Sequence, residues 1–294
     1  MDDRAFSGVS RLLGEERAQR LSESHVVVVG LGGVGSWAAE ALVRSGVGHI
    51  TLIDMDHVAA SNLNRQVHAL TSTVGASKIV VMSKRIADIN PACQVGLVDD
   101  FVTTRNVGDL IPDDADAVID AIDQTAVKAA IVAMCRNRGQ WVLVCGAAGA
   151  LTDPLALERA DLGRAESDPM LARLRKRLRR EYGFERGRGN RLGIATIFSR
   201  EHASAVVGEA AGALPGAADL PASPLACAGY GSIVTVTAAM GMAAAADTIT
   251  FLQDKPGHSG AQCHPPGVTG VVVPGNYNKT NRGPDQPAQP LENT

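Results

Sequence analysis

A short apolar run that leads directly into a glycine-rich loop constrains the fold of this chain more than any other feature. Residues 25–29 read HVVVV, a β-branched run typical of a strand that is buried on both faces. The loop GLGGVG follows at residues 30–35, and residues 36–45 carry alanine and leucine on one helical stripe. A strand, a glycine loop and a helix in immediate succession are typical of a parallel α/β sheet.

The alternation of strands and helices continues along the chain. We expect strands at residues 50–53, 117–120 and 141–145, and helices at residues 78–89 and 126–138. Because short links join these elements, the pattern predicts an α/β fold with a Rossmann-like, doubly wound and mainly parallel sheet.

The segments outside this alternation have a different composition. Residues 1–24 are polar and predict a helical arm, for which Ser10 is a candidate cap. Residues 151–226 form a long crossover segment that is charged at first and ends in an Ala-, Pro- and Gly-rich stretch, where we expect a mobile loop. Pro, Gly, Asn and Gln dominate residues 254–294, which predicts a disordered tail after a single domain of residues 1–253.

Residues 232–252 form an Ala- and Thr-rich stretch with no charge before Asp247. Its length would permit a membrane span, but alanine and threonine carry little transfer free energy and Asp247 interrupts the stretch. We therefore interpret it as a core strand and helix that extend the same domain at its C-terminus. A dimer interface is one possible location of these elements.

The composition excludes several classes of protein. The formal net charge of −3, from 28 basic and 31 acidic residues, argues against a generally basic nucleic-acid-binding protein but not against a local basic patch. An aromatic content of 3% argues against a base-stacking platform. The five cysteines contain no C-x-x-C pair, which argues against a disulfide framework and against a structural zinc site. With no apolar run in residues 1–10, we expect no signal peptide and a cytoplasmic protein.

The glycine loop predicts a nucleotide site. Its G-x-G-x-x-G spacing stands directly after a strand and opens a helix, where backbone N–H groups approach a phosphate at the positive helix end. The second expected strand ends at Asp54 and Asp56, and either carboxylate suits the hydroxyls of a ribose, as in an NAD enzyme. The glycines of the loop are Gly30, Gly32, Gly33 and Gly35.

The following segment distinguishes ATP from NAD. A triphosphate carries about four charges and needs cations and a metal, whereas a helix N-terminus largely satisfies a dinucleotide. Arg65 and Lys78 are candidate cations, and Asp123 is a candidate ligand for Mg²⁺. Each alone is typical of an ordinary surface charge, but their clustering at the carboxyl ends of parallel strands favours a site.

Several motifs, in order and with matching spacing, resemble one known family. GLGGVGSWAAEALVRSGVG, LIDMDHVAASNLNRQVHAL, VGASK and DAIDQ are similar to motifs of the ubiquitin-activating-like (ThiF/MoeB/HesA) adenylating enzymes. LGEERAQRL near the start and CAGYGSIVTVTAAMGM near the end extend the resemblance over about residues 5–253. Within the family, the motifs most resemble the branch of tRNA threonylcarbamoyladenosine dehydratases.

The resemblance implies a homodimer that uses ATP and Mg²⁺ to activate a carboxylate as an acyl-adenylate, with a monovalent cation as a further bound group. It implies that Asp56 holds the ribose and that Asn62, Arg65 and Lys78 face the phosphates. It implies Asp123 as the magnesium ligand. The implied partners are tRNA and a sulfur-acceptor protein linked to a cysteine desulfurase, with no DNA and no structural zinc.

The chain departs from the family pattern in its cysteines. Many sulfur-carrier activators hold zinc with two C-x-x-C pairs, and ubiquitin-type members form a thioester on a cysteine in the crossover segment. This chain has neither, since no cysteine occurs between Cys145 and Cys227. Cys227 is interpreted as a small buried residue, with a nucleophile as the alternative. Some relatives place an N-terminal arginine at the phosphates across the dimer, and both Arg4 and Arg11 are candidates for that role.

Nine basic residues lie between Met170 and Arg191, an exception on an acidic chain. Leucines at helical spacing predict an amphipathic helix with a cationic outer face. We interpret this face as a binding surface for the phosphate backbone of tRNA. A solvated charged face and attachment to a membrane surface are the alternatives. The candidate tRNA-binding residues are Arg173, Arg175, Lys176, Arg179 and Arg180.

Three functions are compatible with these patterns. The favoured one is an ATP-dependent tRNA threonylcarbamoyladenosine dehydratase, in which the catalytic residues Arg65, Lys78 and Asp123 supply charge stabilisation. The second is adenylation of the C-terminus of a ubiquitin-like or sulfur-carrier protein. The third is an NAD-dependent oxidoreductase, which the glycine loop and Asp54 permit.

Overall fold

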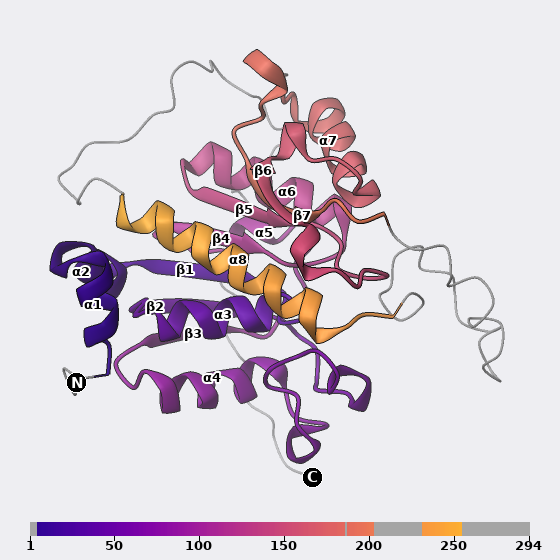
Figure 1. The fold of residues 1–294 in the computed structure, drawn as a ribbon. Coiled ribbons are helices and arrows are strands. Elements are labelled where there is room, and N and C mark those ends of the chain that lie inside the picture. Colours follow the sequence, from indigo (N-terminus) through magenta and orange to yellow (C-terminus); the bar gives the residue numbers. More distant parts are fainter. Residues whose placement is uncertain (1–4, 186, 203–230, 255–294) are drawn as a thin grey trace, which may run out of the picture. The chain divides into compact units, whose positions relative to one another are not determined.

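The computed structural model describes residues 5–185, 187–202 and 231–254. Within these ranges, seven strands form one sheet in the order β3-β2-β1-β4-β5-β7-β6, and every pairing is parallel except that of β6 with β7 (Figure 1). The mainly parallel α/β sheet predicted from the sequence is therefore confirmed. The strands are β1 (His25–Val29), β2 (His49–Ile53), β3 (Gln94–Val98), β4 (Ala117–Asp120), β5 (Trp141–Cys145), β6 (Leu157–Asp161) and β7 (Ala195–Ser199).

Helices cover both faces of the sheet (Figure 1). One apolar cluster joins Val26 and Val28 to α3, α4 and α8, and the other joins Val27 and Val29 to α6 and α7. Both clusters take alternate valines of β1, which explains why the whole run is apolar. The helices are α1 (Ser7–Leu13), α2 (Glu15–Glu23), α3 (Gly35–Arg44), α4 (Lys78–Ile89), α5 (Val107–Leu110), α6 (Thr125–Arg138), α7 (Pro169–Tyr182) and α8 (Val234–Gln253).

The N-terminal arm is helical, as expected, but it is two helices that meet at Gly14, where φ is +88°. Ser10 lies inside α1, and Phe6 occupies the cap position without a side-chain hydrogen bond, so the predicted Ser10 cap is wrong. Arg11 lies in the last turn of α1. Arg4 lies outside the described residues.

The crossover segment contains more regular structure than its composition suggests. β6, α7 and β7 all fall between residues 151 and 200, and the two strands extend the sheet. The expected mobile loop at the end of this segment lies almost entirely outside the described residues. The same is true of the predicted tail.

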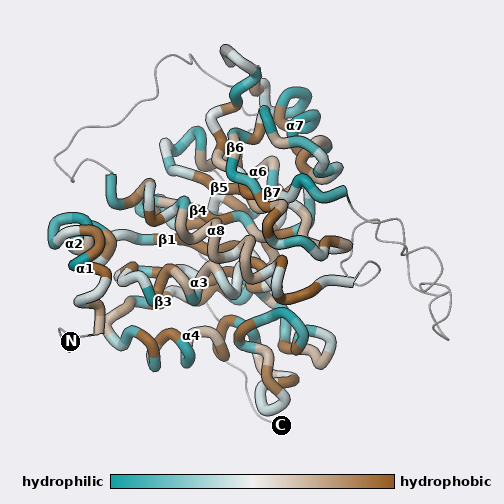
Figure 2. The backbone as a smooth tube through the Cα atoms, in the orientation of Figure 1, coloured by the Kyte–Doolittle hydropathy of each residue, from teal (hydrophilic) through white to brown (hydrophobic). Residues whose placement is uncertain are grey.

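Residues 234–253 form one continuous helix, α8, so the strand expected at the start of this stretch is wrong. By length and composition, α8 alone among the described helices could cross a membrane, and its mean hydropathy is 1.3. Its hydrophobic residues alternate with less apolar ones along the tube in Figure 2. Asp247 on α8 is buried and forms an ion pair with Arg159 of β6, and Gly241 lets α8 approach α3 closely. These contacts are those of a core helix.

Candidate active site

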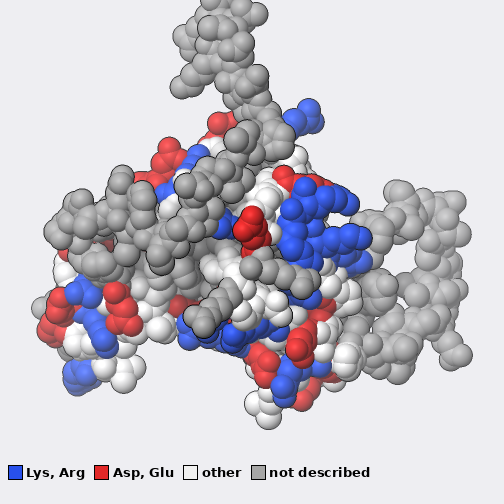
Figure 3. All heavy atoms as spheres, turned by 90° about the horizontal axis from the view of Figure 1, so that it is seen from above, with Lys and Arg blue, Asp and Glu red and all other residues white. Residues whose placement is uncertain are grey.

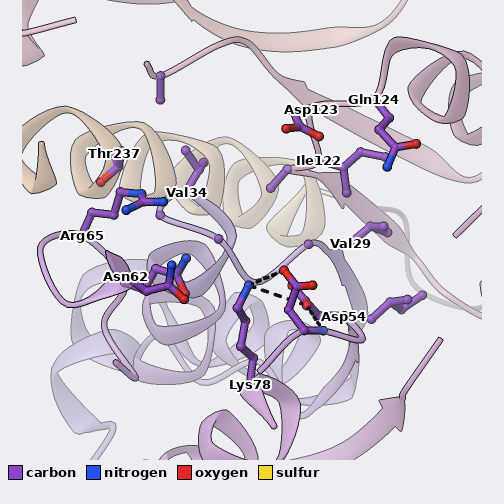
Figure 4. A pocket seen from close by; sticks show the side chains of 18 of the residues that line it. Val29, Val34, Asp54, Asn62, Arg65, Lys78, Ile122, Asp123, Gln124 and Thr237 are labelled. Carbon is purple, nitrogen blue, oxygen red and sulfur yellow. Dashed lines mark hydrogen bonds and ion pairs between the residues drawn. The ribbon is translucent and has the colours of Figure 1, made fainter. Parts of the chain in front are cut away.

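A cavity of about 390 Å³ lies at the carboxyl ends of β1, β2 and β4 (Figure 4). Because β1 stands between β2 and β4, the strand order reverses here, and ligands of open parallel sheets bind at such a point. The segment after β2, the first residue of α4 and the loop after β4 add to the walls. The predicted site residues that line the cavity are Gly30, Gly32, Gly33, Asp54, Asp56, Asn62, Arg65, Lys78 and Asp123.

The glycine loop needs its glycines for two different reasons. Gly30 has a φ of +87°, and a Cβ on Gly35 would lie 1.8 Å from the Gly30 carbonyl oxygen. Gly35 therefore lets α3 begin directly against the end of β1, although it does not line the cavity. A Cβ on Gly32 would meet nothing within 4 Å, so the backbone there is open to a ligand.

Asp54 is held by the chain's own backbone. Its Oδ2 accepts a hydrogen bond from the Leu31 N–H at 2.6 Å, and its Oδ1 accepts one from the Asp56 N–H at 2.8 Å. Burial raises the pKa of Asp54, and the Lys78 ammonium group, 3.9 Å from Oδ1, opposes this rise. Asp54 thus ties the glycine loop to the end of β2. A ribose contact by Asp54 stays a prediction.

Lys78 brings a buried cation to the cavity. Its side chain is 6% exposed, and its Nζ lies 2.7 Å from Oδ2 of Asp56, whose side chain is 67% exposed. Lys78 is also the first residue of α4, so its ammonium group and the positive helix end act on the same region. An anion in the cavity would therefore meet a fixed, poorly hydrated positive charge, as phosphate groups require.

Arg65 and Asn62 lie together on the wall opposite Ile122, in the segment after β2 (Figure 4). Arg65 Nη1 donates to the Ser61 carbonyl oxygen at 2.7 Å and to Asn64 Oδ1 at 2.9 Å, which fixes the guanidinium group. The Arg65 carbonyl oxygen in turn accepts a hydrogen bond from Trp37 Nε1 at 2.9 Å. The side chain is thus positioned before any ligand binds.

Asp123 lies across the cavity from Lys78, beside Gln124 (Figure 4). Within the described ranges its carboxylate makes no hydrogen bond or ion pair, and no cluster of three or more His, Cys, Asp or Glu side chains forms a closed metal site. Mg²⁺ commonly binds one or two carboxylates together with phosphate oxygens and water. An accessible carboxylate opposite a buried lysine fits that mode of binding.

A fully buried ion pair supports the loop that carries Asp123. Lys128 Nζ lies 3.0 Å from Asp120 Oδ1 and donates to the Cys145 carbonyl oxygen at 3.0 Å. Both side chains are 0% exposed, and burial raises the pKa of Asp120 while Lys128 opposes that rise. The Ile122 N–H also donates to Asp120 Oδ1, so the pair holds the chain between β4 and Asp123.

Other parts of the cavity wall were not expected from the sequence. Phe101 and Val102 follow β3, an edge strand whose Gln- and Gly-containing sequence does not stand out as a strand. The loop after β5, at residues 146–149, also lines the cavity. Its Ala147 N–H donates to Asp168 Oδ2 at 2.8 Å, and Asp168 Oδ1 caps α7. The signal that could have found this wall is the run GAAG at residues 146–149, directly after an expected strand.

The described cysteines are poor nucleophiles. Burial raises the pKa of Cys135 and of Cys145 to about 12, and that of Cys93 to about 11. Thiolates, which are the reactive form, are therefore scarce at neutral pH in the described part of the chain. Cys227 lies outside it.

The basic residues expected to bind tRNA lie on α7 and not in the cavity. Met170, in the first turn of that helix, lines the cavity, so α7 begins at the site and leads away from it. Arg180 is paired with Glu181, and Arg175 Nη1 donates to the Leu162 and Ala165 carbonyl oxygens. Arg173, Lys176 and Arg179 make no such contacts within the described residues.

A glycine loop at the end of β1, with cations and carboxylates around one cavity, is typical of α/β proteins that bind a nucleotide by its phosphate groups. The chain belongs to the ThiF family, which residues 6–270 match. The family resemblance seen in the sequence is thereby confirmed.

Within this family, the chain is similar to one kind of enzyme in particular. The chain is 41% identical over 258 residues to the tRNA threonylcarbamoyladenosine dehydratase of Escherichia coli, covering 87% of this chain and 96% of that protein. It is 41% identical over 196 residues to the dehydratase of the same name from Bacillus subtilis, covering 67% and 74%. The crystal structure of the Escherichia coli enzyme with ATP superposes with a TM-score of 0.75 at 40% identity, over 85% of this chain and 94% of that chain.

Proposed function

We propose that this protein is an ATP-dependent tRNA threonylcarbamoyladenosine dehydratase. The observation that carries the proposal is the buried Lys78 beside Asp56 and the glycine loop, in a chain that matches the Escherichia coli dehydratase over nearly its whole length. That relative is also known as a complex with ATP and as a complex with AMP.

The chemistry follows from the charges in the cavity. A carboxylate resists attack because its leaving group would be oxide, so its oxygen must first be bonded to the α-phosphorus of ATP. Pyrophosphate leaves in this step, and Lys78 and Arg65 would stabilise the negative charge that develops on it. Mg²⁺, when held by Asp123 and the phosphates, would neutralise further charge.

Ring closure needs no protein nucleophile. The carbamoyl group of the same modified base is tethered beside the activated carbonyl, so its attack is intramolecular and has a high effective molarity. AMP leaves with the former carboxylate oxygen, and a carbamoyl N–H loses its proton. The modified base thus loses the elements of one water molecule in total. The high pKa values of the described cysteines agree with a route that forms no thioester.

We further propose a homodimer in which Arg11 or Arg4 reaches the partner's phosphates, and a cytoplasmic location, where tRNA is found. The five basic residues of α7 predicted to bind tRNA would contact its backbone. The monovalent cation, the sulfur-acceptor partner and contact with a membrane surface stay predictions.

The test is incubation of tRNA that carries threonylcarbamoyladenosine with the protein and ATP-Mg²⁺, followed by mass spectrometry of the nucleosides. We expect each modified base to lose the mass of one water, with AMP formed in equal amount. Lys84→Ala is a matched control for Lys78→Ala, because Lys84 is an exposed lysine of the same helix. An unchanged nucleoside mass, or tight binding of NAD without binding of ATP, would contradict the proposal.

Adenylation of a carrier protein is the second candidate. A relative of that class, the molybdopterin-synthase adenylyltransferase of Escherichia coli, is 36% identical but over only 44% of this chain. Formation of AMP and pyrophosphate with a carrier protein, and not with modified tRNA, would favour it.

A further inference from the structure

A second cavity, of about 430 Å³, lies along α7. Among the described residues, none lines both this cavity and the one at the ends of β1, β2 and β4, which we call the nucleotide cavity. Three cations of α7, Arg175, Lys176 and Arg179, form one wall. Gly163, from the turn after β6, and Asn190, from the loop before β7, form the opposite wall. Lys and Arg atoms gather at the surface over this helix (Figure 3). Within the part of the chain that the structure describes, no carboxylate lines this cavity.

The cations of this cavity are not neutralised by the described part of the protein. Arg177 and Arg180, on the same helix, are both paired with Glu181. Lys176 and Arg179 make no hydrogen bond or ion pair with any described residue. Arg175 donates to two carbonyl oxygens, and burial, followed by the like charge of Arg179, lowers its pKa. An anion in the cavity would relieve this crowding of like charges.

The wall facing the cations is rigidly built. The Asp161 carboxylate accepts hydrogen bonds from the Gly163, Leu192 and Gly193 N–H groups at 2.7–2.8 Å, which ties the two loops together. A Cβ on Gly163 would lie 1.7 Å from the Asn190 carbonyl oxygen. Only a glycine at position 163 therefore lets the two loops approach this closely. Asn190 has a φ of +62°, an uncommon conformation that this packing maintains.

We propose that this cavity binds a phosphate of the tRNA backbone, with Lys176 and Arg179 as its principal ligands. The proposal rests on the proposed function, because it takes tRNA as the source of the phosphate. Met170 lines the nucleotide cavity, and Lys176 and Arg179 stand six and nine residues further along α7, about 9 and 14 Å along the helix axis. The phosphate therefore belongs to RNA close to the reacting base.

The experiment measures tRNA affinity against salt concentration for the full-length protein and its variants. Each lost phosphate contact lowers the slope of log affinity against log salt by roughly 0.7–0.9. We expect the double variant Lys176→Gln, Arg179→Gln to lower the slope by about 1.4–1.8, with ATP affinity unchanged. Arg177→Gln is the matched control, since it removes one charge from the same helix outside the cavity, and its slope should equal that of the wild type.

Two results would overturn the proposal. The first is a salt slope of the double variant equal to that of the wild type. The second is a loss of slope in Arg177→Gln as large as the loss in Lys176→Gln alone or in Arg179→Gln alone. Vesicles containing phosphatidylserine are a competing anion source, and displacement of tRNA by these vesicles but not by inorganic phosphate would assign the cavity to a membrane instead. Failure of dehydration with the salt slopes as expected would contradict only the proposed reaction.

Discussion

Replacing Lys128 with methionine tests the energetics beneath the active site most directly. The ammonium group of this fully buried residue contacts Asp120 Oδ1 at 3.0 Å, the Asp120 carbonyl oxygen at 3.3 Å and the Cys145 carbonyl oxygen at 3.0 Å. Methionine has a similar length and stays apolar throughout. The substitution therefore leaves Asp120 as a buried carboxylate without its partner.

The expected cost follows from that burial. Removing one partner of a buried ion pair destabilises a protein by about 3–5 kcal/mol, because the other charge stays in a poorly solvated site. At this chain length, 1 kcal/mol shifts the melting temperature by about 2–4 °C, so the variant should melt roughly 6–20 °C lower. The double variant Asp120→Asn, Lys128→Met has neither buried charge, and the amide oxygen at position 120 can still accept the hydrogen bond from the Ile122 N–H. Most of the lost stability should therefore be recovered.

The loss should also depend on pH. Burial raises the native pKa of Asp120, and removing Lys128, which opposes that rise, raises it further. A carboxyl group with a raised native pKa favours the folded state at low pH and loses that contribution as pH rises through the native value. The stability gap between wild type and Lys128→Met should therefore be larger at pH 8 than at pH 5.5.

Urea denaturation at both pH values measures this gap. A deficit below about 1 kcal/mol at pH 8 would show that the buried pair is not the structural support described above. A deficit of equal size at the two pH values would refute the assignment of the loss to an unpaired Asp120 carboxylate. The double variant is the control, since its gap to the wild type should change little with pH.

Three further predictions concern the catalytic charges, Cys227 and the cap of α7. Arg65→Ala, Lys78→Ala and Asp123→Ala should each lower turnover about a hundredfold or more, because each removes a positioned charge, and near-normal AMP formation by all three would refute the phosphate assignment. Cys227→Ser should keep wild-type AMP formation, whereas loss of activity with an intact circular dichroism spectrum would point to a covalent intermediate. Asp168→Ala should cost about 0.5–2 kcal/mol in urea denaturation through the lost cap of α7. It should also raise the KM for ATP, because the Ala147 N–H in the cavity wall loses its acceptor. An unchanged KM would show that Asp168 does not help to position the wall of the nucleotide cavity.

Much of the fold and the core of the site could be predicted because their signals are local. The valine run of β1 and the glycine loop after it are contiguous, and the helix expected at residues 78–89 has those bounds in the structure. Arg65, Lys78 and Asp123 line one cavity because the ends of neighbouring parallel strands meet at one edge of the sheet. The comparisons then confirm the family that these motifs indicated.

The sequence alone thus determined the sheet type, the family and most of the charged residues that line the nucleotide cavity. Tertiary structure alone decided that Asp54 holds the glycine loop, that Lys128 neutralises Asp120 beneath it, and that β6 and β7 extend the sheet. It also decided which cations of α7 have no hydrogen-bond or ion-pair partner among the described residues. Hydrophobic periodicity and loop motifs act over neighbouring residues, whereas each of these features is a contact, or a missing contact, between groups brought together only by packing.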